Sequence, residues 1–321
     1  MTPELPKPHQ NKSNAEIEWM AHNAPHLNVT DTRGSRFCIE KHDEAAARAR
    51  DVQAYSFETR RRGKLRTTGV VVQRPLAHVL ERLATEHAAY ARVALSRSDG
   101  AARGKLAFFD DNELSVLQVG PRGELTPAFC GNATAAVALA HGRPNGRMRL
   151  ADPGGGQVSV DYRRDGNNVA QDWLIPSMSV EDFMWRGRRV FRVNGLNVYN
   201  IVVGGLPVGV AAETCRVQLA AGHPNAKLAV LGDGPERCRV AFYNASGRHG
   251  AAPMTGLASL AVLASSSSAF AAHLGERAVT YQTAAGQEKF DLPEIGTAED
   301  GRLRVAMPDV DAFLSPLGEV S

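Results

Sequence analysis

FCGNATAAVALAHG, residues 129–142, places a lone cysteine, Cys130, directly before a glycine and an apolar, alanine-rich helix. Glycine lets the backbone approach a ligand closely, and the first amides of a helix are unpaired donors. A carboxylate bound there would meet N–H groups and the positive end of the helix dipole, beside a thiol able to move a proton. The alternative for Cys130 is a small buried apolar residue, a common role of free cysteine. Its position at a helix start favours the functional role, because the dipole favours the thiolate form.

A second stretch, TGLASLAVL at residues 255–263, repeats the order of a small polar residue, a glycine and an apolar helix. Both helices are apolar on nearly all faces, which is typical of helices that are buried on every side. Each lies among short strands, so the sequence predicts an α+β chain of two pseudo-symmetric domains. Each domain would be a strongly bent, mainly antiparallel sheet wrapped around its central apolar helix, with the active site in the interdomain cleft. The alternative for Thr255 is a plain N-cap of its helix.

The chain length of 321 residues suits two domains of ordinary size. The glycine run at 154–156 indicates a hinge between them. We also expect an amphipathic helix over 75–95 and a strand over 208–212. The expected order is a flexible N-terminal extension, a first domain, a second domain, and a C-terminal strand and tail that packs back on the first domain: 1–25, 26–150, 151–300 and 301–321.

Composition and charge describe a globular protein that acts on a small molecule. Hydrophobic residues make up 43% of the chain and charged residues 22%. The formal net charge is only +3, so the composition does not indicate a nucleic-acid-binding protein. We interpret the short basic cluster at 60–66 as a solvated loop or strand edge in preference to a polyanion site. Four widely separated cysteines without a CxxC motif argue against a zinc site or a disulfide framework. We expect a cytoplasmic protein with a carboxylate substrate and without cofactor, metal or membrane partner, and a homodimer stays open.

The paired turns resemble those of the diaminopimelate epimerase superfamily, in which a Cys-Gly-Asn turn and a second glycine turn open two matching helices. In its racemases and epimerases both positions are typically cysteines that face each other across the cleft, one removing and one returning a proton. Here the second position is Thr255. A threonine hydroxyl is a far poorer base than a thiol, so the resemblance favours another member of the superfamily over a two-cysteine epimerase.

The chain is similar to the branch that contains 2-methylaconitate isomerase, methylitaconate Δ-isomerase and 4-oxalomesaconate tautomerase. That branch usually places an active-site lysine and the turn cysteine on opposite sides of an allylic substrate, which implies Lys105 and Cys130 here. Arg36 stands where the branch has a lysine, and one glycine of its early turn is missing. The segments that carry the resemblance are Arg33-Gly34-Ser35-Arg36, Lys105-Leu106-Ala107, residues 114–119, Cys130-Gly131-Asn132 and Ala252-Pro253-Met254-Thr255-Gly256.

We therefore predict a cofactor-independent isomerase that moves a C=C bond by proton transfer in a small unsaturated carboxylic acid. Lys105 would act as base and Cys130 as acid, or the reverse for the opposite direction. Amides at the two helix starts would hold the enolate-like charge and the carboxylate. Residues expected to contact the substrate are Gly131, Asn132, Ala133, Met254, Thr255, Gly256, Arg33, Ser35 and His249.

Two kinds of alternative remain. Within enzymes, a racemase or epimerase could use Cys130 with a non-cysteine partner, and the Cys130/Thr255 pair is similar to the Cys/Thr-type dehydratases of the same superfamily, in which one base suffices because water leaves. The other alternative is a member without catalytic activity that binds a carboxylate or a partner protein. The absence of a second turn cysteine and the altered Arg-Gly turn are the features that favour it.

Overall fold

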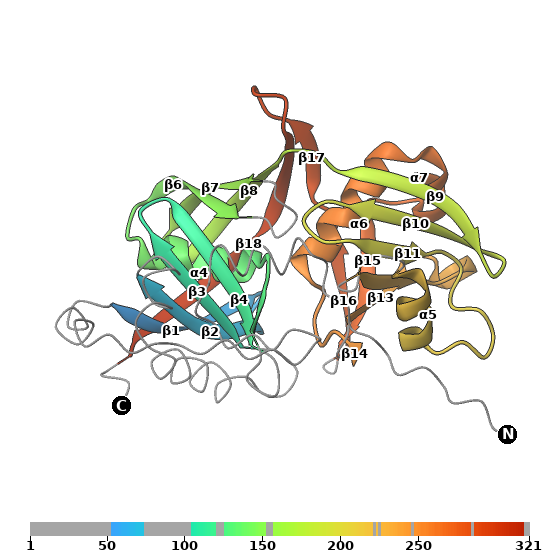
Figure 1. The fold of residues 1–321 in the computed structure, drawn as a ribbon, viewed down its shortest axis with the longest axis horizontal. Helices are drawn as coiled ribbons and strands as arrows, with labels where there is room; N and C mark the ends of the chain where they lie inside the picture. Colours follow the sequence, from blue (N-terminus) through green and yellow to red (C-terminus); the bar gives the residue numbers. More distant parts are fainter. Residues whose placement is uncertain are drawn as a thin grey trace, which may run out of the picture.

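The computed structural model describes residues 53–73, 104–119, 125–151, 157–220, 223, 226–244, 247–283 and 286–317. These residues form two lobes that lie side by side, each with a helix surrounded by strands (Figure 1). Four expectations lie outside the described residues: the N-terminal extension at 1–25, the Arg33–Ser35 turn, the helix over 75–95 and the glycine hinge at 154–156.

The first sheet closes on itself around helix α4 (Gly131–Ala140). Its strands follow the order β1-β2-β3-β4-β6-β7-β8-β18-β17, β5 pairs with β4, and an antiparallel β1–β18 pairing completes the ring. The strands are β1 (Ala54–Arg61), β2 (Lys64–Gln73), β3 (Lys105–Asp110), β4 (Glu113–Val119), β5 (Leu125–Pro127), β6 (Asn145–Ala151), β7 (Gln157–Asp165), β8 (Asn168–Ile175), β17 (Glu294–Thr297) and β18 (Leu303–Pro316).

The second sheet has the order β16-β15-β13-β12-β11-β10-β9, with β14 paired to β13, and wraps around α6 (Met254–Ser266). Helix α5 (Ala212–Leu219) covers its outer face, where Cys215 and Leu219 pack against Val190, Val202 and Leu228. Helix α7 (Ser268–Leu274) follows α6, and a short 3-10 helix spans Gly234–Glu236. The strands are β9 (Ser179–Trp185), β10 (Arg188–Asn194), β11 (Tyr199–Val202), β12 (Lys227–Leu231), β13 (Arg239–Asn244), β14 (Gly247–Arg248), β15 (Ala278–Thr283) and β16 (Gly286–Asp291).

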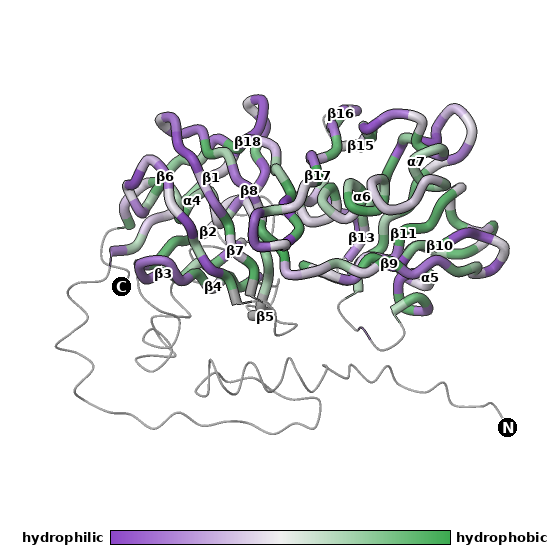
Figure 2. The backbone as a smooth tube through the Cα atoms, turned by 90° about the horizontal axis from the view of Figure 1, so that it is seen from above, coloured by the Kyte–Doolittle hydropathy of each residue, from purple (hydrophilic) through white to green (hydrophobic). Residues whose placement is uncertain are grey.

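Both central helices are buried on nearly every side, as their composition predicts. In α4 the residues from Ala133 to Ala138 have no more than traces of exposed surface, and in α6 the residues from Thr255 to Leu263 are buried. A closed ring of strands leaves little room around α4, which explains why its core positions are mostly alanine, whereas the open second sheet accommodates the leucines of α6. Hydrophobic segments accordingly lie inside both lobes, and hydrophilic ones gather at the outer turns (Figure 2).

The two halves share one strand pattern, so the chain is a two-fold repeat of the predicted α+β kind. In the first half β3 runs parallel to β2 and antiparallel to β4, and β6 then runs parallel to β4 after α4. In the second half β12 runs parallel to β11 and antiparallel to β13, and β15 runs parallel to β13 after α6. The hairpin strands β5 and β14 precede α4 and α6. The predicted fold class is confirmed.

Two local expectations require correction. The expected boundary at 150 is misplaced, because β7 and β8 belong to the first sheet and the chain enters the second sheet only after Ile175. The strand expected over 208–212 is absent from the described residues, where turns lead into α5. The segment from Ala212 to Leu219 places Cys215 and Leu219 four residues apart on one buried face, which is the spacing of a helix and not of a strand.

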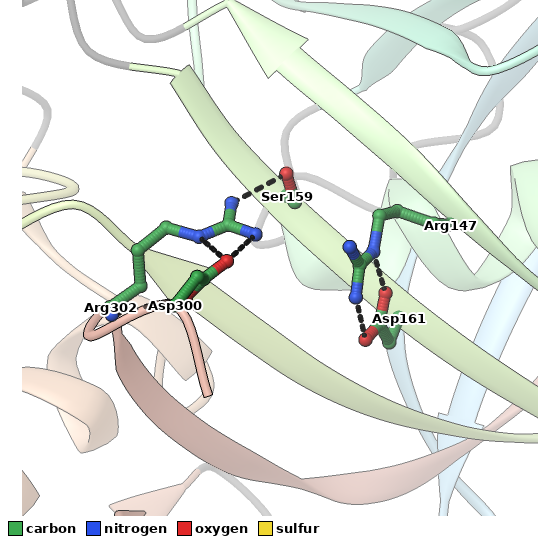
Figure 3. Close-up of polar contacts among 5 residues, drawn as sticks. All are labelled: Arg147, Ser159, Asp161, Asp300 and Arg302. Atoms are coloured by element: carbon green, nitrogen blue, oxygen red, sulfur yellow. Dashed lines mark hydrogen bonds and ion pairs between the residues drawn. The ribbon is translucent and has the colours of Figure 1, made fainter. Parts of the chain in front are cut away.

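The end of the chain returns to the first sheet through β17 and β18. At the turn between these strands Arg302 pairs with Asp300 and donates a hydrogen bond of 2.8 Å to the Ser159 hydroxyl of β7 (Figure 3). Next to it Arg147 of β6 donates to the Asp161 carboxylate, with 2.8 Å from Nη2 to Oδ2. The Arg302–Ser159 hydrogen bond connects the returning chain to β7, and the Arg147–Asp161 pair joins β6 to β7 beside it.

In the part of the chain that the structure describes, no single helix is long and apolar enough to cross a membrane. The bent pair α6–α7 passes such a test only on length and composition, and α6 is the buried core helix of the second lobe.

Candidate active site

The N-terminal ends of the two central helices meet at the interface between the lobes. Cys130 is the N-cap residue of α4 and Pro253 that of α6, and among the described residues neither helix has a side-chain cap or an acidic residue in its first turn. A Cβ on Gly131 would lie 2.9 Å from the Met254 sulfur and 2.4 Å from the Trp173 ring. Only glycine therefore permits this approach, which brings two positive helix ends together.

Buried side chains of β8 hold the first turn in place. Gln171 donates a hydrogen bond of 2.9 Å to the Gly131 carbonyl and accepts one of 3.1 Å from the Trp173 indole. The Phe129 ring packs edge-on against Trp173, with 4.5 Å between ring centroids. Gln171 and Trp173 are at most 2% exposed, so Cys130 sits on a rigid support while its own side chain stays partly accessible.

Lys105 lies at the start of β3, on the face of the strand that points towards α4. Side chains alternate along a strand, and Ala107 and Phe109, which share this face, belong to the core around α4. Lys105 is half-buried, and its register partners are Gly69 on β2 and Gln118 on β4. The lysine thus stands at the rim of the closed sheet.

Lys227 occupies the corresponding place in the second half. It begins β12 on the face shared by Ala229 and Leu231, which belong to the core around α6. Its register partner is Tyr199, and the Lys227 Nζ lies 5.6 Å from the centre of that ring. Desolvation by burial is the main reason that the pKa of Lys227 is lowered to about 7; the charge of Lys105 also lowers this pKa, and the charge of Cys130 raises it. The three groups are therefore close enough to act on one another's charge, across the two halves.

Thr255 belongs to the same site through Tyr199. The expected alternative, an N-cap role, does not hold, because Pro253 is the cap and Thr255 is the second helical residue. Its hydroxyl shares a hydrogen bond of 3.1 Å with the Tyr199 hydroxyl, and both side chains are buried. Burial raises the pKa of Tyr199, so this phenol stays neutral at ordinary pH. Thr255 thereby fixes the ring beneath Lys227.

The other predicted contact residues differ in what they can offer a ligand. Ala133 and Gly256 are buried early in α4 and α6, where only their backbone amides can serve a ligand. The Asn132 side chain donates a hydrogen bond of 2.8 Å to the Thr67 hydroxyl of β2. The His249 ring lies 3.2 Å from the Asn244 amide, on the hairpin of β13 and β14. Arg33 and Ser35 lie outside the described residues.

The basic cluster at 60–66 is more than the solvated loop or strand edge that we expected. It forms the β1–β2 turn, and from it Arg66 makes an ion pair with Glu288 of β16, in the other half. The two side chains are only 7% and 6% exposed. Arg61 and Arg66 lie over the Phe290 ring, with 4.9 and 5.4 Å to its centre, and line a small hollow with Asn132 and Met254. The cluster thus joins the two halves beside the helix ends.

Lys227 and Tyr199 are the site residues that sequence reasoning missed. A lysine at the start of an apolar strand ordinarily marks an exposed edge, and a tyrosine in such a strand ordinarily marks core. The available signal was a repeat: Lys-Leu-Ala opens both the strand at Lys105 and the strand at Lys227, and each strand comes about 25 residues before its helix. As for metals, no cluster of three His, Cys, Asp or Glu side chains suited to an ion occurs among the described residues.

The chain was compared with known proteins. No protein-family model and no curated protein matches the sequence. Among solved structures, a protein from Pseudomonas aeruginosa described as a predicted epimerase is similar, with a TM-score of 0.53, 10% identity, and coverage of 83% of this chain and 98% of that one. The fold is the diaminopimelate epimerase-like fold.

A protein from Clostridium difficile (strain 630), described as a phenazine biosynthesis PhzC/PhzF protein, was also found in this comparison. It is 11% identical, with a TM-score of 0.47 and coverage of 84% of this chain and 99% of that one. At 10% identity the similarity to the Pseudomonas aeruginosa protein establishes the architecture alone. The activity has to be argued from the side chains at the helix ends.

Proposed function

We propose that this chain is an isomerase that relocates a proton without a cofactor, moving a C=C bond within a small unsaturated carboxylic acid. The observation that carries the proposal is the meeting of two uncapped helix ends at Gly131 and Met254, with Cys130 and two lysine amines around them. Each helix end attracts negative charge, and each of the three side chains can carry a proton.

The chemistry needs a carboxylate anchor and a place for transient negative charge. The first backbone hydrogen bonds inside the helices run from Thr134 to Cys130 and from Leu257 to Pro253, so the amides before them make no bond within their helix. Those amides would bind the substrate carboxylate and stabilise the enolate-like intermediate that forms when a proton leaves the carbon beside the double bond. One carrier removes that proton and another delivers a proton to the far alkene carbon. Cys130 and Lys105 are the pair that the resemblance implies, and Lys227 is a further amine.

The test uses a panel of allylic di- and tricarboxylic acids in deuterated water. We expect deuterium at carbon, a change in ultraviolet absorbance for the productive acid, and a loss of at least 100-fold in rate for Cys130→Ala. Cys238→Ala is the matched control, because that half-buried thiol donates to the Leu274 carbonyl within the second lobe. Unchanged exchange in Cys130→Ala, or no exchange by the unaltered chain with any acid, would contradict the proposal.

A racemase or epimerase is the second candidate, and Lys227 is the observation that favours it. Racemisation needs proton carriers on both faces of one carbon, and a second-half amine beside Tyr199 could stand where two-cysteine enzymes have a thiol. Deuterium incorporation with loss of optical rotation and without new absorbance would support racemisation. New absorbance with incorporation at a different carbon would support double-bond migration.

A further inference from the structure

We infer that Lys227 is the base that takes the substrate proton, and that Lys105 keeps its own charge and tunes Lys227. This inference rests on the proposed function, since it divides the roles within the same site. It assigns the proton acceptor to the second half, where the position equivalent to Cys130 holds Thr255, whose hydroxyl is a poor base. Cys130 then acts from the first half.

The place of Lys227 in the fold is the first argument. The parallel pairs β2–β3 and β11–β12 are equivalent in the repeat, and each second strand opens with a lysine on the face that points to its central helix. Cys130 stands at the start of α4 in the first half, and Lys227 stands at the start of β12 in the second half. The charge of Cys130 acts on Lys227, so the two side chains approach the interface from opposite halves. The two halves thus supply one proton carrier each.

The surroundings of the two lysines differ in a way that separates their roles. Lys105 pairs in register with Gly69, which has no side chain, and Lys227 pairs with Tyr199. The Lys227 Nζ lies over the Tyr199 ring, and the hydroxyl of that ring is hydrogen-bonded to Thr255, so the amine is held against a fixed ring. Desolvation by burial disfavours the charged form of the Lys227 amine.

The charges around Lys227 also favour the neutral amine. Two groups of the first half act on it: the Lys105 charge lowers the pKa of Lys227, and the Cys130 charge raises it by a smaller amount. The neutral phenol of Tyr199 lies beside the amine. A desolvated lysine next to a second cation is a known way to obtain a basic amine near neutral pH. Burial and the Lys105 charge together lower the pKa of Lys227 to about 7, so about half of the molecules hold a free amine at that pH.

The proton transfers balance without a further reagent. The neutral Lys227 amine takes a proton from the carbon beside the double bond; a C–H bond breaks, an N–H bond forms, and the electron pair spreads towards the carboxylate. The Cys130 thiol then gives its proton to the far alkene carbon, so an S–H bond breaks and a C–H bond forms. The resulting ammonium and thiolate exchange one proton, directly or through water, and both groups return to their starting states.

Arginine substitutions distinguish the two lysines, because a guanidinium keeps the positive charge and cannot act as a base. We expect Lys227→Arg to lower deuterium exchange by at least 100-fold, and Lys105→Arg to stay within about 10-fold of the unaltered chain. Lys105→Met removes the neighbouring charge, so the pKa of Lys227 rises and the rising limb of the pH–rate profile moves to higher pH. Exchange that survives in Lys227→Arg and fails in Lys105→Arg would overturn the inference and leave the proposed function standing.

A second measurement needs no substrate. The full chain is treated with acetic anhydride at a series of pH values, and the acetylation of each lysine is quantified by mass spectrometry. We expect the reactivity of Lys227 to rise with a midpoint near 7, and that midpoint to increase in Lys105→Met. Lys289 is the internal reference, because it is exposed and its hydrogen bond to Glu276 raises its pKa. A midpoint for Lys227 as high as that of Lys289 would overturn the inference, whatever the catalytic result.

Discussion

The two halves of the chain place a lysine at the same point of the same motif and surround it differently. In the first half Lys105 has a glycine as its register partner, and the helix begins at a cysteine. In the second half Lys227 has Tyr199 as its partner, and the helix begins at a proline. In the proposed site the first half therefore provides the Cys130 thiol and the Lys105 amine, and the second provides the Lys227 amine beside the Tyr199 ring. Variants that affect one half and spare the other sharpen this comparison.

The largest effect is expected where the halves are joined. Arg66→Met leaves the buried Glu288 carboxylate without its ion-pair partner, while Lys64, 3.7 Å away, and Arg61 still act on it. It should lower the free energy of unfolding by about 3–5 kcal/mol. The double variant Arg66→Met/Glu288→Leu should recover most of that loss, since no buried charge then stays unpaired. Urea denaturation followed by tryptophan fluorescence measures both. A loss below about 1 kcal/mol in the single variant would mean that the pair is solvated.

Glycine to alanine changes at the two helix starts come next. Gly131→Ala places a methyl group against Trp173 and Met254, and we expect a loss of about 2–3 kcal/mol together with a strong loss of exchange, because the helix ends are pushed apart. Gly256→Ala meets the Phe242 ring at 2.6 Å, inside its own lobe, and should cost stability with less effect on exchange. The control is Gly296→Ala on β17, where the added Cβ has no described atom within 4 Å. Equal effects on exchange at 131 and 256 would contradict the distinction.

Lys227→Met should stabilise the protein, and more so at low pH. The folded state lowers the pKa of Lys227 from 10.5 to about 7, so the unfolded chain binds more protons between these values. Stability therefore rises with pH across that window, and the penalty of the buried charge is complete below pH 7. We expect a gain on the order of 2 kcal/mol at pH 6, after allowance for partial solvent screening, that fades by about pH 10. Thermal unfolding at several pH values measures it, and a gain independent of pH would show that the amine is not desolvated.

The smallest effect is expected at the Tyr199 ring beneath Lys227. Tyr199→Phe leaves the Thr255 hydroxyl without its 3.1 Å partner and should cost about 1 kcal/mol of stability. Exchange should fall only modestly, because the ring beneath Lys227 is retained. Tyr199→Ala should impair exchange far more, and its circular dichroism spectrum would show whether the second lobe stays folded. Similar exchange in both variants would argue against a role for the ring.

The fold could be predicted from the sequence because its two central helices are apolar on all faces, a local pattern that has one physical explanation. The strands from Lys105, Lys227 and Ala278 were also recognisable as short apolar runs between turns. The domain boundary was not, since sheet membership depends on partners far away in the chain. Nothing within β7 and β8 shows that their neighbours are β6 and β18.

The candidate site was predictable only where its signal lies within a few neighbouring residues. Cys130 stands out because a glycine and a helix follow it directly, which is a signal contained in a few residues. The role of Lys227 depends on Tyr199, Lys105 and Cys130, which come from three other elements, so no local pattern shows it. The contact of Thr255 with Tyr199 could not be predicted for a related reason: this partner lies in a strand more than fifty residues earlier.

The closure of the first sheet has a consequence for the order in which the protein forms during synthesis. The second lobe is one continuous segment, Ser179 to Asp291, and it can assemble as soon as that segment has left the ribosome. The first lobe begins earlier in the chain, yet its ring is completed only by β18, which ends at Pro316. Until that strand arrives, the apolar surface of α4 has no complete cover. The lobe whose strands are synthesised first is therefore the one that is completed last, and the nascent chain must protect the apolar surface of α4 until β18 has been synthesised.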